Sequence, residues 1–79
     1  MFTKHYPNLA WWINNHGWIE IGNDEFNYSM LRVLDIGGMC WEDEESGSLE
    51  ESLDKAERWI SLEIEDRFGE EPPKRYSEE

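Results

Sequence analysis

The chain has few of the features by which small proteins of known type are recognised. Among its 79 residues there is one cysteine, Cys40, so no internal disulfide can form and the disulfide-stapled secreted class is excluded. No apolar run approaches the roughly 20 residues that span a bilayer. The N-terminal segment also lacks the apolar stretch of a signal peptide. We therefore expect a cytoplasmic protein that does not bind a membrane.

Positive charge is equally scarce. The chain has seven basic and 19 acidic residues, which gives a net charge of -12. Nucleic acids are bound through clustered Lys and Arg, so we expect no direct contact with DNA or RNA. Residues 1–41 carry four acids and two bases, a net of -2, whereas residues 42–79 carry 15 acids and five bases, a net of -10. The negative charge therefore belongs to the second half of the chain.

Aromatic residues are plentiful by comparison. They make up 14% of the chain and include five tryptophans, which separates it from disordered acidic segments. The length favours one domain with a thin core, and we place this domain at residues 1–69. Residues 70–79 contain two prolines and little to bury, so we expect a flexible acidic tail there.

The first element expected is a short helix over residues 8–16. Leu9, Trp12 and Ile13 have the spacing of one helical face. Gly17 follows, and we expect it to end the helix in a left-handed conformation.

Three short strands are expected next. They lie at residues 18–21, within residues 26–36 with the clearest β-pattern at 31–34, and at residues 39–42. Turn residues separate them at 22–25 and at Gly37 and Gly38. The pattern predicts a three-stranded antiparallel meander.

The strongest prediction is a helix over residues 49–68. Ser48 and Glu51 form a capping box at its start, and Gly69 ends it. Its apolar stripe consists of Leu49, Leu53, Ala56, Ile60, Ile64 and Phe68. The predicted fold is therefore α+β: a three-stranded antiparallel sheet packed by a long C-terminal helix, with a short N-terminal helix beside it.

Catalytic and metal-binding patterns are weak. Cys40 lies in an apolar strand, where a thiol behaves as a buried hydrophobe. His5 or His16 could approach it, but nothing fixes that geometry. The cysteine and histidines lack zinc-ligand spacing, and the acidic stretch 42–45 fails the EF-hand pattern. We expect no catalytic residue, metal or cofactor, and so no enzyme.

Asp35 and Arg32 stand out among the charged residues. Asp35 precedes a glycine turn, where its side chain can accept a backbone amide. Arg32 can pair with Asp35 or Glu20 across the sheet. An alternative reading makes Arg32, Asp35 and Cys40 the centre of a small ligand-binding module or enzyme.

Two surfaces are candidates for partner binding. Trp11 points about 100° away from the face of Trp12, and with Phe2 and Tyr6 it could form a partner-binding patch. The competing interpretation buries Trp11, and Trp12, Trp18, Trp41 and Trp59 are expected in the core. The second surface is an acidic face formed by Glu42, Asp43, Glu44, Glu45, Glu50 and Glu51.

One stretch also carries a family resemblance. The runs Gly17-Trp18-Ile19-Glu20-Ile21-Gly22 and Leu34-Asp35-Ile36-Gly37-Gly38-Met39-Cys40-Trp41-Glu42 resemble small uncharacterised bacterial proteins of a kind common in cyanobacteria. The resemblance covers residues 7–68. It implies a compact domain and no particular activity.

These observations favour a small acidic domain that works by binding another protein or by regulating it. A homodimer formed through an edge strand is one version of this reading. The alternative is mimicry of nucleic acid, in which the carboxylates occupy the basic groove of a DNA- or RNA-binding protein.

Overall fold

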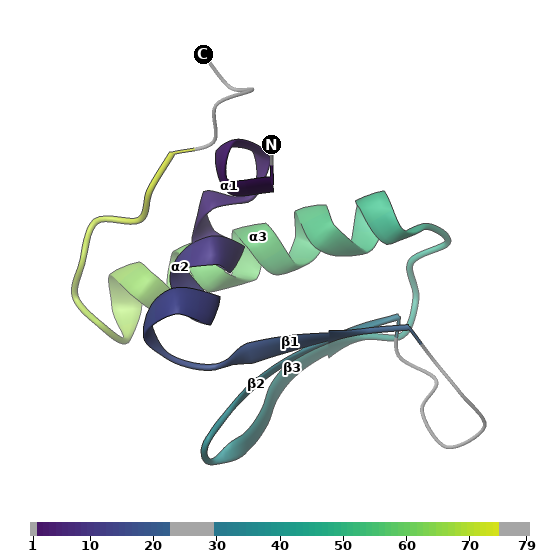
Figure 1. Cartoon of the computed structure of the whole chain (residues 1–79), viewed down its shortest axis with the longest axis horizontal. Coiled ribbons are helices and arrows are strands. Elements are labelled where there is room, and N and C mark those ends of the chain that lie inside the picture. Colours follow the sequence, from purple (N-terminus) through teal and green to yellow (C-terminus); the bar gives the residue numbers. More distant parts are fainter. Residues whose placement is uncertain (1, 23–29, 75–79) are drawn as a thin grey trace.

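The structure, a computed structural model, describes residues 2–22 and 30–74 as two packed layers (Figure 1). One layer is an antiparallel sheet with strand order β1-β2-β3, and α2 and α3 lie together on one side of it. The elements in chain order are α1 (Phe2–His5), α2 (Pro7–Asn15), β1 (Trp18–Ile21), β2 (Leu31–Asp35), β3 (Gly38–Asp43) and α3 (Leu49–Asp66). The predicted α+β fold is confirmed, and α1 is an additional helix that was not predicted from the sequence.

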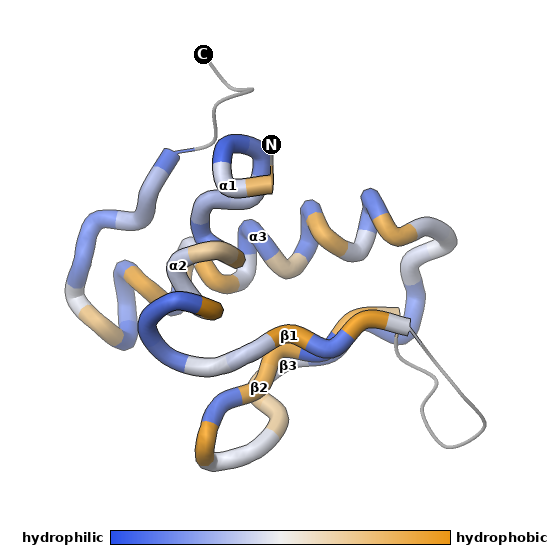
Figure 2. The backbone as a smooth tube through the Cα atoms, viewed as in Figure 1, coloured by the Kyte–Doolittle hydropathy of each residue, from blue (hydrophilic) through white to orange (hydrophobic). Residues whose placement is uncertain are grey.

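The core lies between the sheet and the two helices. Figure 2 shows hydrophobic residues recurring along α3 at intervals, as an amphipathic helix requires. Leu49 departs from the predicted stripe, since it is 41% exposed at the first position of the helix. The buried cluster consists of Leu9, Trp12, Leu31, Val33, Leu53, Ala56, Ile60 and Ile64.

At the start of α3 the cap at Ser48 forms as predicted, whereas Glu51 reaches the amide of the preceding residue, Gly47, in place of the Ser48 amide. The Glu51 amide donates to Ser48 Oγ at 3.2 Å, and Glu51 Oε1 in return accepts from the Gly47 amide. After the helix, Gly69 adopts a positive φ of 69°, and the Glu70 amide donates to the Ile64 carbonyl at 3.1 Å. This six-residue closure satisfies a carbonyl that the helix end would otherwise leave free.

Gly17 has a different role from the one expected. It is not among the described glycines with positive φ, which are Gly22, Gly38 and Gly69. A Cβ atom at Gly17 would lie 1.9 Å from the Leu34 carbonyl oxygen and 2.6 Å from Trp12 Nε1. Trp12 Nε1 donates to that same carbonyl at 2.9 Å. Glycine is therefore needed because the connection between α2 and β1 approaches the backbone of β2 closely at Leu34, and the expectation of a left-handed stop was wrong.

Two further expectations concern the ends of elements. The predicted turn at 22–25 and the start of the predicted second strand fall largely on residues 23–29, which lie outside the described residues, as do residues 75–79 of the predicted tail. Residues 70–74 run back along the helices (Figure 1), and the Pro73 carbonyl accepts from Asn8 Nδ2 at 2.9 Å.

Candidate functional site

The strand register sorts the sheet residues onto two faces. Directly opposed residues in an antiparallel pair share a face, and neighbours along a strand alternate. Val33 and Leu31 belong to the core, so the residues paired with them face the helices as well. Arg32 and Leu34 therefore mark the opposite face, on which Figure 1 shows no described helix.

This opposite face, which we call the free face, carries an apolar row. Trp18 is paired with Leu34, and Leu34 with Met39. Trp18 is 42% exposed and Met39 52% exposed, while Ile36, at the turn next to this row, is 97% exposed. The expectation that Trp18 belongs to the core is therefore wrong, because its position in the register turns it away from the helices.

A charged row lies next to the apolar row on the free face. Arg32 is paired in register with Glu20 on one side and Glu42 on the other. Its Nε donates to Glu20 Oε1 at 3.2 Å and its Nη2 to the Gly22 carbonyl at 2.8 Å. This cross-strand pair is the Arg32–Glu20 alternative that was predicted from the sequence. The row is net negative because it contains two carboxylates and one guanidinium group.

The helix-facing side gathers a different polar cluster. Asp35 Oδ2 accepts from His16 Nε2 at 2.8 Å and from Arg67 Nη2 at 3.4 Å. Asp35 Oδ1 accepts from the Gly37 amide at 2.8 Å, as the turn chemistry predicted. The hydrogen bond from His16 is the main reason that the pKa of Asp35 lies below its ordinary value of 3.8.

Cys40 belongs to this cluster because of a break in the β2-β3 register. Val33 pairs with Trp41 but Leu34 pairs with Met39, so Cys40 is the extra residue of a bulge. Its partial burial and the neighbouring Asp35 carboxylate raise the pKa of the thiol, against the opposing effect of Arg67. A protonated thiol is a poor nucleophile, so the arrangement does not activate Cys40.

The structure therefore divides the predicted trio of Arg32, Asp35 and Cys40. Asp35 and Cys40 lie together, joined by His16 and Arg67, whereas Arg32 lies on the free face of the sheet. The alternation of side chains along β2 is the reason, since residues 32 and 35 differ by an odd number of positions. A site that uses all three predicted residues is not formed.

The predicted acidic face loses one member. Asp43 is only 5% exposed, and its carboxylate accepts from Ser46 Oγ and Ser52 Oγ and from the amides of Glu45 and Ser46. Burial alone would raise the pKa of Asp43, but these hydrogen bonds outweigh it and the pKa is lowered. Asp43 therefore organises the loop before α3.

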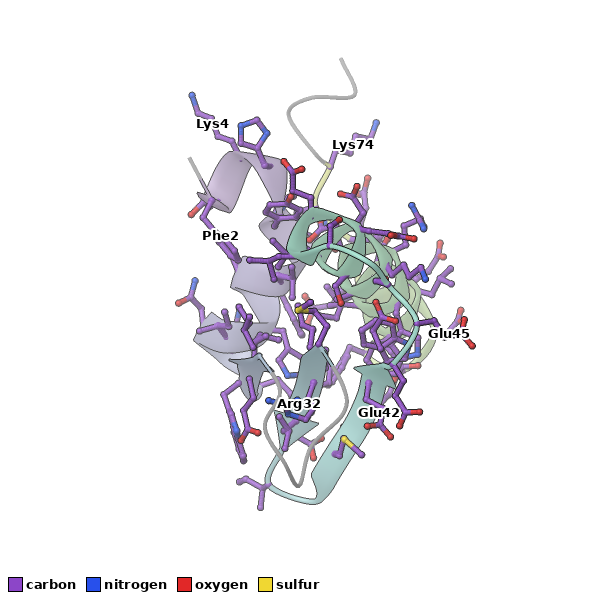
Figure 3. All side chains as sticks on the ribbon, turned by 90° about the vertical axis from the view of Figure 1, so that its right-hand side faces the viewer. Phe2, Lys4, Arg32, Glu42, Glu45 and Lys74 are labelled. Atoms are coloured by element: carbon purple, nitrogen blue, oxygen red, sulfur yellow. The ribbon has the colours of Figure 1, made fainter. Side chains whose placement is uncertain are left out.

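The other predicted acidic residues lie around this loop. Glu42 is half-buried on β3, whereas Glu44, Glu45, Glu50 and Glu51 are exposed. Figure 3 shows Glu42 and Glu45 together at one end of the molecule. Along α3 the carboxylates are interrupted by Lys55, which pairs with Glu51 at 3.9 Å, and by Arg58.

The predicted aromatic patch is divided between two places. Phe2 is 46% exposed, and its ring centroid lies 5.4 Å from that of Tyr6. Trp11 instead packs on Phe68, with centroids 5.2 Å apart, and is half-buried against the core. Phe2 and Tyr6 adjoin, while Trp11 belongs to the helix layer.

The most unusual polar residue, Glu57, was not singled out from the sequence. It is 1% exposed, and its carboxylate accepts from the backbone amides of Asn8 and Leu9 and from Asn8 Nδ2. Tyr6, which precedes α2, provides no side-chain cap. A signal existed in the sequence: Glu57 stands four residues after Leu53, on the apolar side of its helix.

Comparison with protein-family models, with curated proteins and with solved structures gave no match. Within residues 2–22 and 30–74, no helix is long and apolar enough to cross a bilayer. In the same part of the chain, no three His, Cys, Asp or Glu side chains are arranged to hold a metal ion. Function must therefore be argued from the surfaces.

Proposed function

We propose that this chain is a small protein-binding domain whose partner docks on the free face of the sheet. The observation that carries the proposal is the apolar row Trp18, Leu34 and Met39, in which Trp18 and Met39 are exposed and Leu34 is half-buried, extended by the fully exposed Ile36. Contiguous exposed apolar side chains bordered by charge are typical of interaction surfaces. Tryptophan is also enriched among residues that dominate binding energy.

Charge defines the kind of partner. The Glu20–Arg32–Glu42 row borders the apolar row and has one more negative than positive charge. We therefore expect a partner surface with an apolar centre bordered by Lys or Arg. A second copy of this chain is disfavoured, because it would bring another net charge of -12 against the first.

The test compares two matched double variants in affinity capture from a lysate of the source cells. Ile36→Ser with Met39→Ser alters the free face. Ile13→Ser with Leu62→Ser removes two other exposed apolar side chains, 46% and 58% exposed, from α2 and α3. We expect one protein to bind the wild type and the helix variant but to bind the face variant at least about tenfold more weakly. Salt should release it, since charge contributes to the contact.

Three results would overturn the proposal. One is capture that does not differ between the two double variants. Another is a wild-type dimer in sedimentation that the face variant dissociates, which would make this face a self-interface. The third is a partner lost only when Glu44 and Glu45 are changed to Gln, which would favour mimicry of nucleic acid instead.

A further inference from the structure

A cavity of about 480 Å³ lies on the helix side of the molecule, away from the free face. Asn8 and Glu57 form its buried part, and Leu62, Pro72 and Pro73 supply apolar walls. The segment after α3 lines one side of it through residues 71–74, and Figure 1 shows this segment turning back along the helices. Its size is in the range of small-molecule sites.

Two cations that line this cavity have no ion-pair partner among the described residues. Arg58 and Lys74 are exposed, and neither forms an ion pair with any residue that the structure describes. In the same part of the chain, Arg32, Lys55 and Arg67 each pair with a carboxylate. Figure 3 shows Lys74 well separated from Glu42 and Glu45. In so acidic a chain, two cations on one cavity that pair with no carboxylate in residues 2–22 and 30–74 are suited to binding an anion.

The two carboxylates of the cavity do not occupy these cations. Glu57 is turned to the start of α2, where it accepts four hydrogen bonds from Asn8 and Leu9. Glu71 is exposed and forms no ion pair with Arg58 or Lys74.

Asn8, which lines the cavity, also carries a buried acceptor with no donor among the described residues. Asn8 Nδ2 donates to Glu57 Oε2 at 2.5 Å and to the Pro73 carbonyl at 2.9 Å. These two acceptors fix the orientation of the Asn8 side-chain amide. If the amide were flipped, its oxygen would face Glu57 Oε2 and the Pro73 carbonyl oxygen, which are both acceptors. Asn8 Oδ1 is then buried with no hydrogen-bond partner among the described residues. A buried unpaired acceptor is costly and calls for a donor.

We propose that this cavity binds a small carboxylic acid with an apolar body and one N–H or O–H donor, of the kind represented by an N-acylated apolar amino acid. Arg58 and Lys74 hold the carboxylate at the mouth. Leu62 and the two prolines contact the apolar body. The donor reaches Asn8 Oδ1 when the segment at Pro73 shifts to admit the ligand.

The experiment is a titration of the ¹⁵N-labelled full chain with N-acetyl-L-leucine, followed by NMR. We expect saturable shifts at Asn8, Arg58 and Leu62 with an affinity of about millimolar, as suits so small a ligand. N-acetyl-L-leucine amide, which lacks the negative charge, should bind at least about tenfold more weakly. The N-methylated acid, which lacks the donor, should also bind more weakly.

Variants assign the contacts. Arg58→Gln with Lys74→Gln changes two exposed side chains, so the fold should persist, and we expect binding of N-acetyl-L-leucine to fall about tenfold. Lys55→Gln on the same helix is the matched control and should leave it unchanged. The proposal is overturned if binding does not saturate at an N-acetyl-L-leucine concentration about 20 times the expected dissociation constant of about 1 mM. It is also overturned if the acid and the amide bind with equal affinity, or if Lys55→Gln weakens binding as much as the double variant does. Equal affinity for the N-methylated acid would overturn the role of Asn8.

Discussion

Glu57 places a carboxylate inside the helix layer, where an unpaired charge would be strongly unfavourable. It is tolerated because the positive end of α2 meets it, with the amides of Asn8 and Leu9 donating at 2.9–3.1 Å. α2 begins with Pro7 and has no side-chain cap of its own. A residue 49 positions away therefore supplies the cap that the local sequence lacks.

We expect Glu57→Gln to destabilise the protein by about 1–3 kcal/mol, because the side-chain NH₂ group of glutamine would face the N–H donors of Asn8 and Leu9. Urea unfolding followed by tryptophan fluorescence measures the change. Glu65→Gln, at an exposed position of the same helix, is the control and should remain within about 0.5 kcal/mol of the wild type. Equal midpoints for the two variants would show that the cap contributes nothing.

Asp35 gives the protein a defined response to acid. Its pKa is lower in the folded chain than its ordinary value of 3.8, chiefly because of the hydrogen bond from His16. A pKa that is lower in the folded than in the unfolded chain stabilises the fold at pH values above the unfolded-state pKa. This contribution is lost as the pH falls through the folded-state pKa. We expect Asp35→Asn to be less stable than the wild type near pH 7, with the difference shrinking below pH 3.8. Thermal unfolding of both proteins between pH 7 and pH values below 3.8 measures this difference in stability. A difference that does not change with pH would contradict the lowered pKa of Asp35.

At the scale of elements, the contact of the α2–β1 connection with β2 depends on the absence of one side chain. Gly17→Ala would place a methyl group against the Leu34 carbonyl and the Trp12 indole that donates to it. We expect a loss of about 1–3 kcal/mol, typical of overpacking. Gly47→Ala is the matched control, since a Cβ there meets nothing within 4 Å. If both variants unfold at the same urea concentration, the close approach is not needed.

The elements themselves could largely be predicted from the sequence, because their signals are local. The capping box at Ser48 and the apolar stripe of α3 determine a helix without reference to the rest of the chain. What escaped prediction depends on contacts between distant residues. The bulge that places Cys40 beside Asp35 and the meeting of Glu57 with Asn8 follow from how the layers pack, and no short pattern records them.

The predicted site was only partly correct for the same reason. Asp35 and Arg32 were grouped by proximity in the chain, but strand alternation separates them while packing brings His16 and Arg67 to Asp35. Trp18 was predicted to be buried because it lies in a strand that could face the core. Knowing the register of β1 against β2 would have placed it on the free face.

At the scale of the whole molecule, the net charge of -12 should work against folding. We expect stability to rise with salt, by roughly 1 kcal/mol between low ionic strength and about 1 M, where the screening length falls to about 3 Å. Thermal melts in NaCl and in KCl measure this, and agreement between the two salts excludes an effect of a specific cation. A fall in stability would mean that the described ion pairs outweigh the general repulsion.

The position of Asn8 between Glu57 and the Pro73 carbonyl also has a consequence for the order of folding. These contacts join residues 49 and 65 positions apart, whereas the β2-β3 hairpin closes over a few residues. Long loops lose more entropy on closure, so non-local contacts tend to form late. We expect φ-values of about 0 for Leu9→Ala and clearly higher values for Val33→Ala. The N-terminal helix would then be the last part of the chain to dock and the first to leave.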